Sequence, residues 1–369
     1  MSAAGELSQD EAFARIRLLR SPNVGPVTYR HLLARFGDAR RALEALPDLG
    51  GKTGRAYVPA PEHRVQAEIA AARKAGARYL FHDSPDYPPL LAQAEGAPPI
   101  LTYRGDTALA ARPCVAMVGA RNASAAAIRL AREFAHDLAG QGWSVVSGLA
   151  RGIDGAAHRG ALATGATIGV IASGIDVTYP PEHADLQEEV AQSGLLLAEQ
   201  PPGTEPLARH FPTRNRIIAG LAAGTVVVEA APRSGSLITA RLAGEMGRHV
   251  MAVPGSPLDA RAHGCNQLIR DGAILVQSPA DIIEMLSDFA GNPSFPFVPQ
   301  QSAPMPSGNH ADPAQGSAQV HAMLTTAPVA VDELIRQAGG GTAAVHLALM
   351  ELELDGRLVR HAGGRVSLA

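Results

Sequence analysis

The feature of this sequence that most constrains its fold is an alternation of short apolar runs with segments of helical character. Seven apolar runs bounded by glycine or serine follow one another, at 115–118, 144–146, 167–171, 195–198, 225–228, 249–253 and 274–276. Several are separated by about 10 to 20 residues that are compatible with a helix, as in βαβ units. The pattern predicts an α/β fold with an extended Rossmann-like, doubly wound parallel sheet over residues 106–290.

Residues 1–105 have a different pattern, and we expect a small helical domain followed by a connecting segment. Apolar residues recur at helical spacing over 10–19 and over 27–36, with the turn PNVGP at 22–26 between them. A turn that opens a helix in this way resembles helix-hairpin-helix and SAM-like modules, whose helix N-terminal amides can bind a DNA phosphate. A role in packing alone is the alternative.

The C-terminal part reads as a linker and a third domain. Residues 291–313 are dense in Pro, Ser, Gln and Asn, which predicts a flexible linker. Residues 314–369 then show three helical segments followed by a hairpin, the outline of a winged helix, at 317–325, 331–337, 342–354, 357–360 and 365–368. The third helix carries Glu351, Glu353 and Asp355 without Lys or Arg, so a protein contact is favoured over duplex DNA.

Composition excludes several classes of protein. The chain has 369 residues, 46% hydrophobic and 18% charged, which is the balance of a globular protein. No apolar run approaches the roughly 20 residues that span a bilayer, and the N-terminus lacks the pattern of a signal peptide, so we expect a cytoplasmic protein without a membrane partner. Cys114 and Cys265 form no CxxC pair, which makes them expected core residues.

Small residues and arginines gather in the loops that should follow the strands. Because the carboxyl ends of parallel strands share one edge of a sheet, these loops should converge there, with the positive ends of the following helices. A polyanion can approach backbone amides where side chains are small. We therefore expect a phosphate-binding edge built by the segments GARN 119–122, SGLARGID 147–154, SGID 173–176, RSGS 233–236 and PGS 254–256.

The segment FPTRNR at 211–216 adds two further arginines to this edge. Pro212 and Thr213 suit a helix start, which places Arg214 and Arg216 in the first turns. Cations at a helix N-terminus are unfavourable unless an anion binds, which again favours phosphate. Phe211 suits a hydrophobic staple or a platform for a stacked base.

Enzyme patterns fit the sequence poorly. Ser147, Asp154 and His158 lie close together, but no GxSxG elbow is present, and an N-cap or packing role is favoured for the pair at i, i+4. There is no HExxH metal motif and no GxGxxG dinucleotide fingerprint. We expect no catalytic residues, no metal and no cofactor.

Several long motifs resemble the DprA family, also called Smf, of bacterial DNA processing proteins. They run in the family order through nearly all of 113–285, as VGARNAS, SGLARGIDGAAHRGAL, GIDVTYPPEH, FPTRNRIIAGL, VVEAAPRSGSLITARLAGEMGR and VMAVPGSP…GCNQLIRDGA. The resemblance implies a protein that is not an enzyme and that acts in natural transformation, also called competence, and in DNA recombination. Such a protein protects and binds single-stranded DNA, forms homodimers and loads the recombinase RecA.

Carried over by motif, the resemblance implies a set of DNA-binding residues that largely coincides with the loops above. They are Arg121, Ser147, Gly148, Arg151, Phe211, Arg214, Asn215, Arg216, Ser234, Gly235 and Ser236. One departure is that Arg209 and His210 stand just before the Phe, where many members have lysine.

Two other functions stay open. A nucleoside-monophosphate phosphoribohydrolase shares the general fold, but its catalytic glutamate falls on Thr239, and Glu229 is the nearby substitute. A winged-helix regulator of duplex DNA is disfavoured by the acidic third helix.

Overall fold

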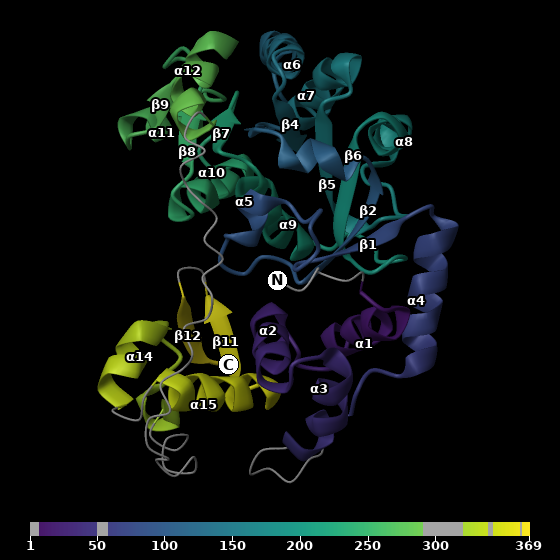
Figure 1. Cartoon of the computed structure of the whole chain (residues 1–369). Coiled ribbons are helices and arrows are strands. Elements are labelled where there is room, and N and C mark those ends of the chain that lie inside the picture. The colour runs from purple at the N-terminus through teal and green to yellow at the C-terminus, as the bar shows by residue number, and fades with distance from the viewer. Residues whose placement is uncertain (1–6, 50–57, 291–319, 339–341, 362–363) are drawn as a thin grey trace. The chain divides into compact units, whose positions relative to one another are not determined.

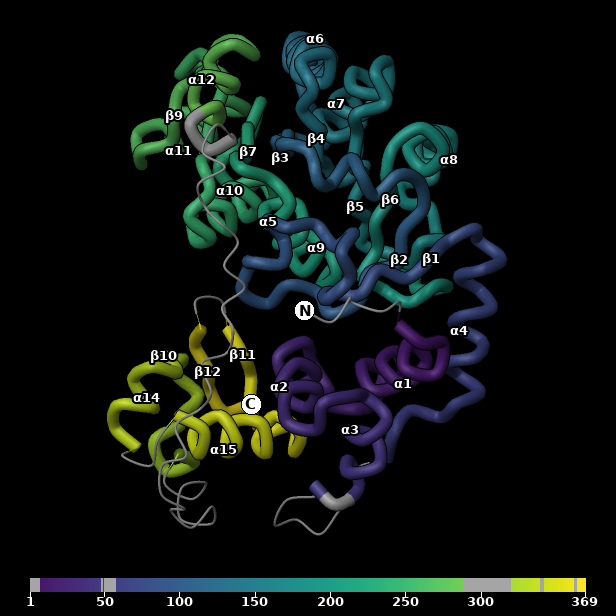
Figure 2. Tube along the Cα trace, viewed as in Figure 1, coloured from purple at the N-terminus to yellow at the C-terminus, as the bar shows by residue number. Residues whose placement is uncertain are grey.

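The computed structural model describes residues 7–49, 58–290, 320–338, 342–361 and 364–369. The chain divides into two compact units, one of residues 68–296 and one that combines residues 1–67 with residues 297–369. Figure 1 shows the elements of both units, and Figure 2 traces the same chain as a tube. The predicted linker at 291–313 lies outside the described residues.

The larger unit is built on a single mixed sheet. Within the described residues it has nine strands in the order β1-β2-β6-β5-β4-β3-β7-β8-β9. The seven from β3 to β9 pair in parallel and correspond to the seven predicted apolar runs. Their bounds are β3 Cys114–Val118, β4 Ser144–Ser147, β5 Thr167–Gly174, β6 Leu195–Gln200, β7 Gly224–Val227, β8 His249–Ala252 and β9 Ile274–Leu275. The doubly wound parallel sheet is therefore confirmed.

Helices cover both faces of this sheet, because alternate residues of each strand point to opposite sides. Val115 and Met117 of β3 pack in a core with α6, α7 and α12, whereas Ala116 and Val118 pack in another with α5, α9 and α10. Cys114 and Cys265 are buried in the second of these cores, as predicted. The helices are α5 Pro89–Ala92, α6 Ala125–Gly140, α7 Ile153–Ala161, α8 Ala184–Ser193, α9 His210–Leu221, α10 Ser236–Glu245, α11 His263–Arg270 and α12 Pro279–Ala290.

Two strands were missed by the sequence reading of residues 1–105 as helices and turns. β1 (Arg78–Phe81) pairs antiparallel with β2 (Ile100–Gly105), and β2 pairs antiparallel with β6. They extend the parallel sheet at one edge, with Leu80 and Leu101 in its core. Short strands beside many turn residues give little periodicity, so only the pairing of β1 with β2 and of β2 with β6 reveals them.

The smaller unit contains the predicted helical hairpin and the winged helix. The first helices are α1 (Gln9–Leu19), capped by the Ser8 side chain, and α2 (Pro26–Phe36), with Pro26 at its first position. They are followed by α3 (Ala39–Ala45) and α4 (Glu62–Lys74), whose C-terminal part belongs to the larger unit. The winged helix consists of residues 320–323, β10 Val329–Ala330, α14 Val331–Ala338, α15 Thr342–Leu354, β11 Leu358–His361 and β12 Arg365–Leu368.

Helix α15 of the winged helix packs against α2 within this unit. Met350 and Leu354 are buried in the core formed by the N-terminal helices. The Thr28 hydroxyl donates to Glu353 Oε2 at 2.5 Å, and the Asn23 side-chain amide donates to the Leu354 carbonyl at 2.7 Å. Glu353 and the C-terminal end of α15 are thus engaged by the N-terminal helices, and the preference of the winged helix for a protein partner over duplex DNA stays a prediction. No helix among the described residues has the length and hydrophobicity needed to cross a membrane.

Candidate nucleic-acid interface

The candidate site lies where the strand order reverses. β3 is flanked by β4 on one side and by β7 on the other, so the loops that follow β3 and β7 diverge to opposite halves of the sheet. Ligands of open α/β sheets bind in the crevice that such a divergence leaves. A cavity of about 770 Å³ lies at this point, lined by the loops at 119–122 and 231–236 and by the first turns of α9.

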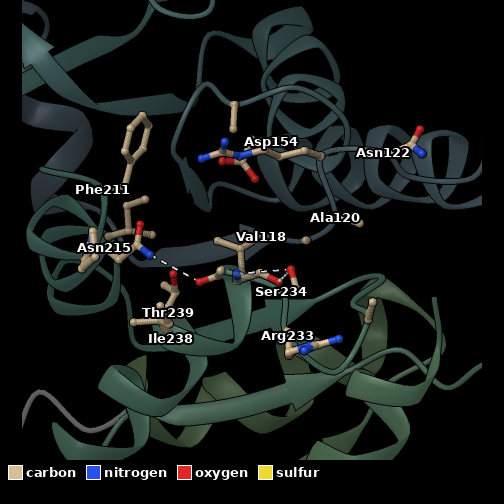
Figure 3. A pocket seen from close by; sticks show the side chains of 18 of the residues that line it. Val118, Ala120, Asn122, Asp154, Phe211, Asn215, Arg233, Ser234, Ile238 and Thr239 are labelled. Atoms are coloured by element: carbon tan, nitrogen blue, oxygen red, sulfur yellow. Dashed lines mark hydrogen bonds between the residues drawn. The ribbon is translucent and has the colours of Figure 1, made fainter. Parts of the chain in front are cut away.

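The first cavity has a mixed lining of small, polar and cationic residues. Figure 3 shows Phe211 and Asn215 of α9 on one side and Ala120 and Asn122 on the other. The Asn215 side-chain amide donates to the Gly235 carbonyl at 3.4 Å, which ties α9 to the loop after β7. Arg121 and Arg233 are exposed at this cavity.

A second cavity of about 340 Å³ adjoins the first. The two share Arg121, Asn122, Ala150, Phe211 and Arg214. The second is also lined by Arg151 and by Tyr179, a residue that is 41% exposed. The Tyr179 ring meets the Phe211 ring edge-on, with centroids 5.6 Å apart. The two cavities therefore meet at an aromatic pair.

Phe211 is also flanked by two guanidinium groups. The Cζ atom of Arg121 lies 5.1 Å from the Phe211 ring centroid, and that of Arg214 lies 6.0 Å from it. Arg121 has no carboxylate within ion-pair distance in the described part of the chain. A planar cation beside an aromatic ring is a surface on which a nucleobase stacks and a phosphate binds.

Arg214 differs from Arg121 because it is buried. Its side chain is 7% exposed, and Nη1 lies 3.9 Å from Oδ2 of the equally buried Asp154. Burial lowers the pKa of Arg214, and the charge of Asp154 opposes that shift. Burial likewise raises the pKa of Asp154, against the pull of Arg214 and of backbone amides. Arg214 is therefore a buried side chain in the lining of both cavities, and its charge is compensated by Asp154.

The backbone amides at the helix starts beside the cavities differ in whether they already donate a hydrogen bond. At the start of α6, Glu229 accepts from the Ser124 amide at 2.9 Å and from its hydroxyl at 2.6 Å, so the chain's own carboxylate occupies that helix N-terminus. At the start of α10 the Ser236 amide donates to the Ser234 hydroxyl at 3.4 Å, but the Gly235 amide donates no hydrogen bond to any described residue. A Cβ at Gly235 would meet open space. The RSGS loop is the better place for a phosphate.

The structure gathers most of the predicted residues around the two cavities. Those that line one cavity or both are Arg121, Gly148, Arg151, Phe211, Arg214, Asn215, Ser234, Gly235 and Ser236. Ser147 is elsewhere, fully buried with its hydroxyl donating to the Met117 carbonyl at 2.6 Å. Arg216 also lines neither cavity. α9 begins at His210, so Phe211 lies inside its first turn and does not precede the helix as expected.

Arg216 is held by internal acceptors. Its Nη2 donates to Glu199 Oε1, and its Nη1 donates to the Gly96 carbonyl at 2.5 Å. Both side chains of the pair are less than one-fifth exposed. This geometry indicates a structural ion pair.

Replacing Arg216 with methionine should therefore reduce stability more than DNA affinity. Loss of its charged hydrogen bonds leaves Glu199 without a partner and should cost about 2–3 kcal/mol in the free energy of unfolding. Urea titration measures this, and the double variant Arg216→Met/Glu199→Gln should recover part of the loss. A weaker salt dependence of DNA binding at unchanged stability would instead assign Arg216 to the DNA.

Some residues at the site were not predicted from the sequence. Tyr179 and Pro180 line the second cavity, and Arg261 lines the first. Tyr179 and Pro180 belong to the motif GIDVTYPPEH, but nothing in that motif marks them as cavity residues, and Arg261 belongs to none of the quoted motifs. The residues tested for a catalytic triad do not form one: His158 Nδ1 lies 2.7 Å from Thr167 Oγ1, and Ser147 bonds to Met117.

Comparison with known proteins decides the family. The family described as DNA recombination-mediator protein A matches residues 78–287, the DprA-like N-terminal HHH domain matches residues 9–71, and the DprA winged helix domain matches residues 302–364. The chain belongs to the DNA recombination-mediator protein A family. Its N-terminal helices are thus a helix-hairpin-helix domain, and its C-terminal domain is a winged helix, as predicted.

Named relatives in this family share much of the chain. Protein Smf of Escherichia coli is 37% identical over 314 residues, which cover 85% of this chain and 83% of the relative. DNA processing protein DprA of Streptococcus pneumoniae is 46% identical over 198 residues, which cover 53% of this chain and 70% of the relative.

Solved structures of two family members have the same fold. The crystal structure of S. pneumoniae DprA matches with a TM-score of 0.63 and 36% identity, over 74% of this chain and 97% of that one. A structure of DNA processing protein A from Helicobacter pylori, described for its single-stranded DNA binding mode, matches with a TM-score of 0.53 and 28% identity, over 58% of this chain and 98% of that one.

Proposed function

We propose that this chain binds single-stranded DNA in the two adjoining cavities, without catalysing a reaction on it. The observation that carries the proposal is the arrangement at Phe211, where one exposed and one buried guanidinium flank an aromatic ring at the junction of the cavities. The described single-strand binding of the H. pylori protein supports it. Stacking on a ring tolerates every base, so we expect little sequence preference.

The cavities supply separate groups for phosphate and base. Arg121, Arg151 and Arg233 are exposed cations that would neutralise phosphates, and the open Gly235 amide at the start of α10 would hold another. Arg151 also pairs with exposed Glu182, an ion pair of small energetic weight that a phosphate can replace.

The phosphoribohydrolase alternative has no support from the acidic groups of the site. Asp154 is the one acidic residue among the described residues that line the cavities, and it is buried against Arg214 and the Gly148 amide. Glu229, the proposed substitute for the missing glutamate, caps α6 and lines neither cavity. Neither carboxylate is placed to assist glycosidic cleavage.

The wider role that we propose is protection of incoming DNA and loading of the recombinase RecA in natural transformation, by a homodimer in the cytoplasm. The family description as a recombination mediator supports the RecA part, and the names of the relatives support DNA processing. A dimer would place two such sites on one strand.

Titration of a fluorescent dT oligomer against the full chain at increasing salt tests the proposed site. Three phosphate contacts at about 0.7 counterions each predict that log affinity falls with log salt with a slope of about −2 per protomer. Arg121→Ala should make the slope less negative by about 0.7. Arg241→Ala, which removes an exposed charge of α10 that pairs with Glu245, is the control and should leave the slope unchanged. Binding that is absent or independent of salt contradicts the proposal.

A further inference from the structure

The loop after β4, residues 148–152, has an unusual backbone. Leu149 has φ = 57° and Gly152 has φ = 74°. The left-handed conformation is unfavourable for a leucine and persists only where surrounding groups hold it. Leu149 is itself completely buried.

Asp154 is the main group that holds this loop. It lies in the first turn of α7 and is 6% exposed. Its Oδ2 accepts from the Gly148 amide at 3.1 Å, and the Ala150 amide also bonds to the carboxylate. Between these two amides, the Leu149 carbonyl accepts from His183 Nδ1 at 2.9 Å. Three successive residues are thus fixed, two of them by one carboxylate.

The same carboxylate holds the guanidinium of Arg214. A Cβ added at Gly148 would lie 1.3 Å from Arg214 Nη1 and 2.7 Å from Asp154 Oδ2. The guanidinium therefore lies directly against the Gly148 backbone, next to the carboxylate. Arg214 Nε is buried without a partner, so the ion pair with Asp154 is its charge compensation within the described residues.

The loop also determines the position of Arg121. A Cβ at Gly152 would lie 2.2 Å from the Ala120 carbonyl oxygen and 2.7 Å from that of Arg121, and the Ile153 amide donates to the Ala120 carbonyl at 3.3 Å. The two loops are in direct backbone contact. The loop itself carries Arg151.

We propose that Asp154 is the positioning residue of this site. Its carboxylate fixes residues 148–152 and the side chain of Arg214 in one arrangement. That arrangement brings three guanidinium groups to the two cavities, those of Arg121, Arg151 and Arg214. The inference rests on the proposed single-strand binding. Asp154 itself does not contact the strand, because a carboxylate repels phosphate. Asp154 therefore lies as a negative charge beside a site for an anion. Its role in holding the loop and Arg214 in place outweighs its repulsion of the DNA phosphate.

Asp154→Asn separates these two effects, because they have opposite signs. If charge alone mattered, removal of a carboxylate beside the site would strengthen DNA binding. Positioning predicts the reverse: affinity for the dT oligomer about tenfold lower, with a salt slope less negative by about 0.7 to 1.4, the loss of one or two phosphate contacts. Anisotropy titrations of the full chain at several salt concentrations measure both.

Glu182→Gln is the matched control. It removes the same charge from an exposed residue beside the second cavity and releases Arg151, so it should bind dT more tightly than the wild type. Asp154→Asn binding as tightly as the wild type, or more tightly, overturns the inference. A wild type without salt-dependent binding contradicts the proposed function instead, so the two failures are distinct.

A second pair of variants covers the case in which Asp154→Asn does not fold. Asp154→Asn/Arg214→Gln removes both buried charges and is compared with Arg214→Gln alone. Positioning predicts that the double variant still binds at least threefold more weakly, because asparagine has one acceptor oxygen for the Gly148 and Ala150 amides where the carboxylate has two. Equal affinity of the two variants would show that Asp154 does no more than neutralise Arg214, and the inference would be wrong.

Discussion

Replacing Phe211 with alanine should weaken binding of a dT oligomer about 5- to 150-fold. Stacking of one base on an aromatic side chain contributes about 1–3 kcal/mol, and each 1.4 kcal/mol is a factor of ten. Because the ring carries no charge, the salt slope should stay at its wild-type value. Phe211 is half-buried and lies in the first turn of α9, so the fold should persist.

Two conservative variants show whether the aromatic face is responsible. Phe211→Tyr keeps the ring beside Arg121 and should bind within about twofold of the wild type, whereas Phe211→Leu keeps apolar volume without a π-face and should bind nearly as weakly as alanine. Tight binding by the leucine variant would mean that Phe211 only packs, and the base would have to stack elsewhere. Tyr179, edge-on to the ring, would then be the next residue to change.

Acidification should destabilise the larger unit through His158. This side chain is completely buried, and burial lowers its pKa to about 3, with His183 and Arg214 adding to the shift. In the unfolded chain the pKa is 6.5, so below that pH the unfolded state binds a proton that the native state excludes. Stability is complete above pH 6.5 and falls by about 1.4 kcal/mol per pH unit as pH drops towards 3. Between pH 7 and 4.5 the loss should be about 2–3 kcal/mol.

Urea unfolding at the two pH values measures this loss. Trp143, the single tryptophan, is buried in the core that includes α6 and α7 and reports on the larger unit. His158→Gln cannot take up the proton and should lose stability less steeply with acid, even where it is less stable at pH 7. Exposed His63→Gln is the control and should follow the wild type. The same pH dependence in the wild type and in His158→Gln would exclude His158 as the cause.

The hydrophobic pattern of short sequence segments is sufficient to predict many of the strands and helices. β5 and β6 are continuous apolar runs because both faces of a parallel strand are covered, and such runs are visible in any sequence. Helix α15 begins and ends at the predicted residues, Thr342 and Leu354. β10 was missed: its two residues acquire their structure only by pairing with β12.

Some features of the candidate site could be predicted from the sequence, and others could not. Positions next to strand ends could be predicted, because the direction of a parallel strand places its following loop at one edge of the sheet. Which arginine is exposed could not be predicted. Arg121 and Arg216 look equivalent in sequence, yet Arg216 is bound by Glu199 and Gly96, and Arg214 is buried with Asp154.

The sequence by itself therefore determined the order of strands and helices. It also determined the edge of the sheet at which the glycine, serine and arginine residues of the loops lie. Both follow from hydrophobic periodicity and turn chemistry, which act between near neighbours in the chain. Only the tertiary structure decided which arginine side chains stay exposed and which helix N-terminus keeps a backbone amide without a hydrogen bond. It also decided how Asp154 connects the loop after β4 to α9. Those outcomes depend on contacts between residues far apart in sequence, and burial and charge compensation act through space.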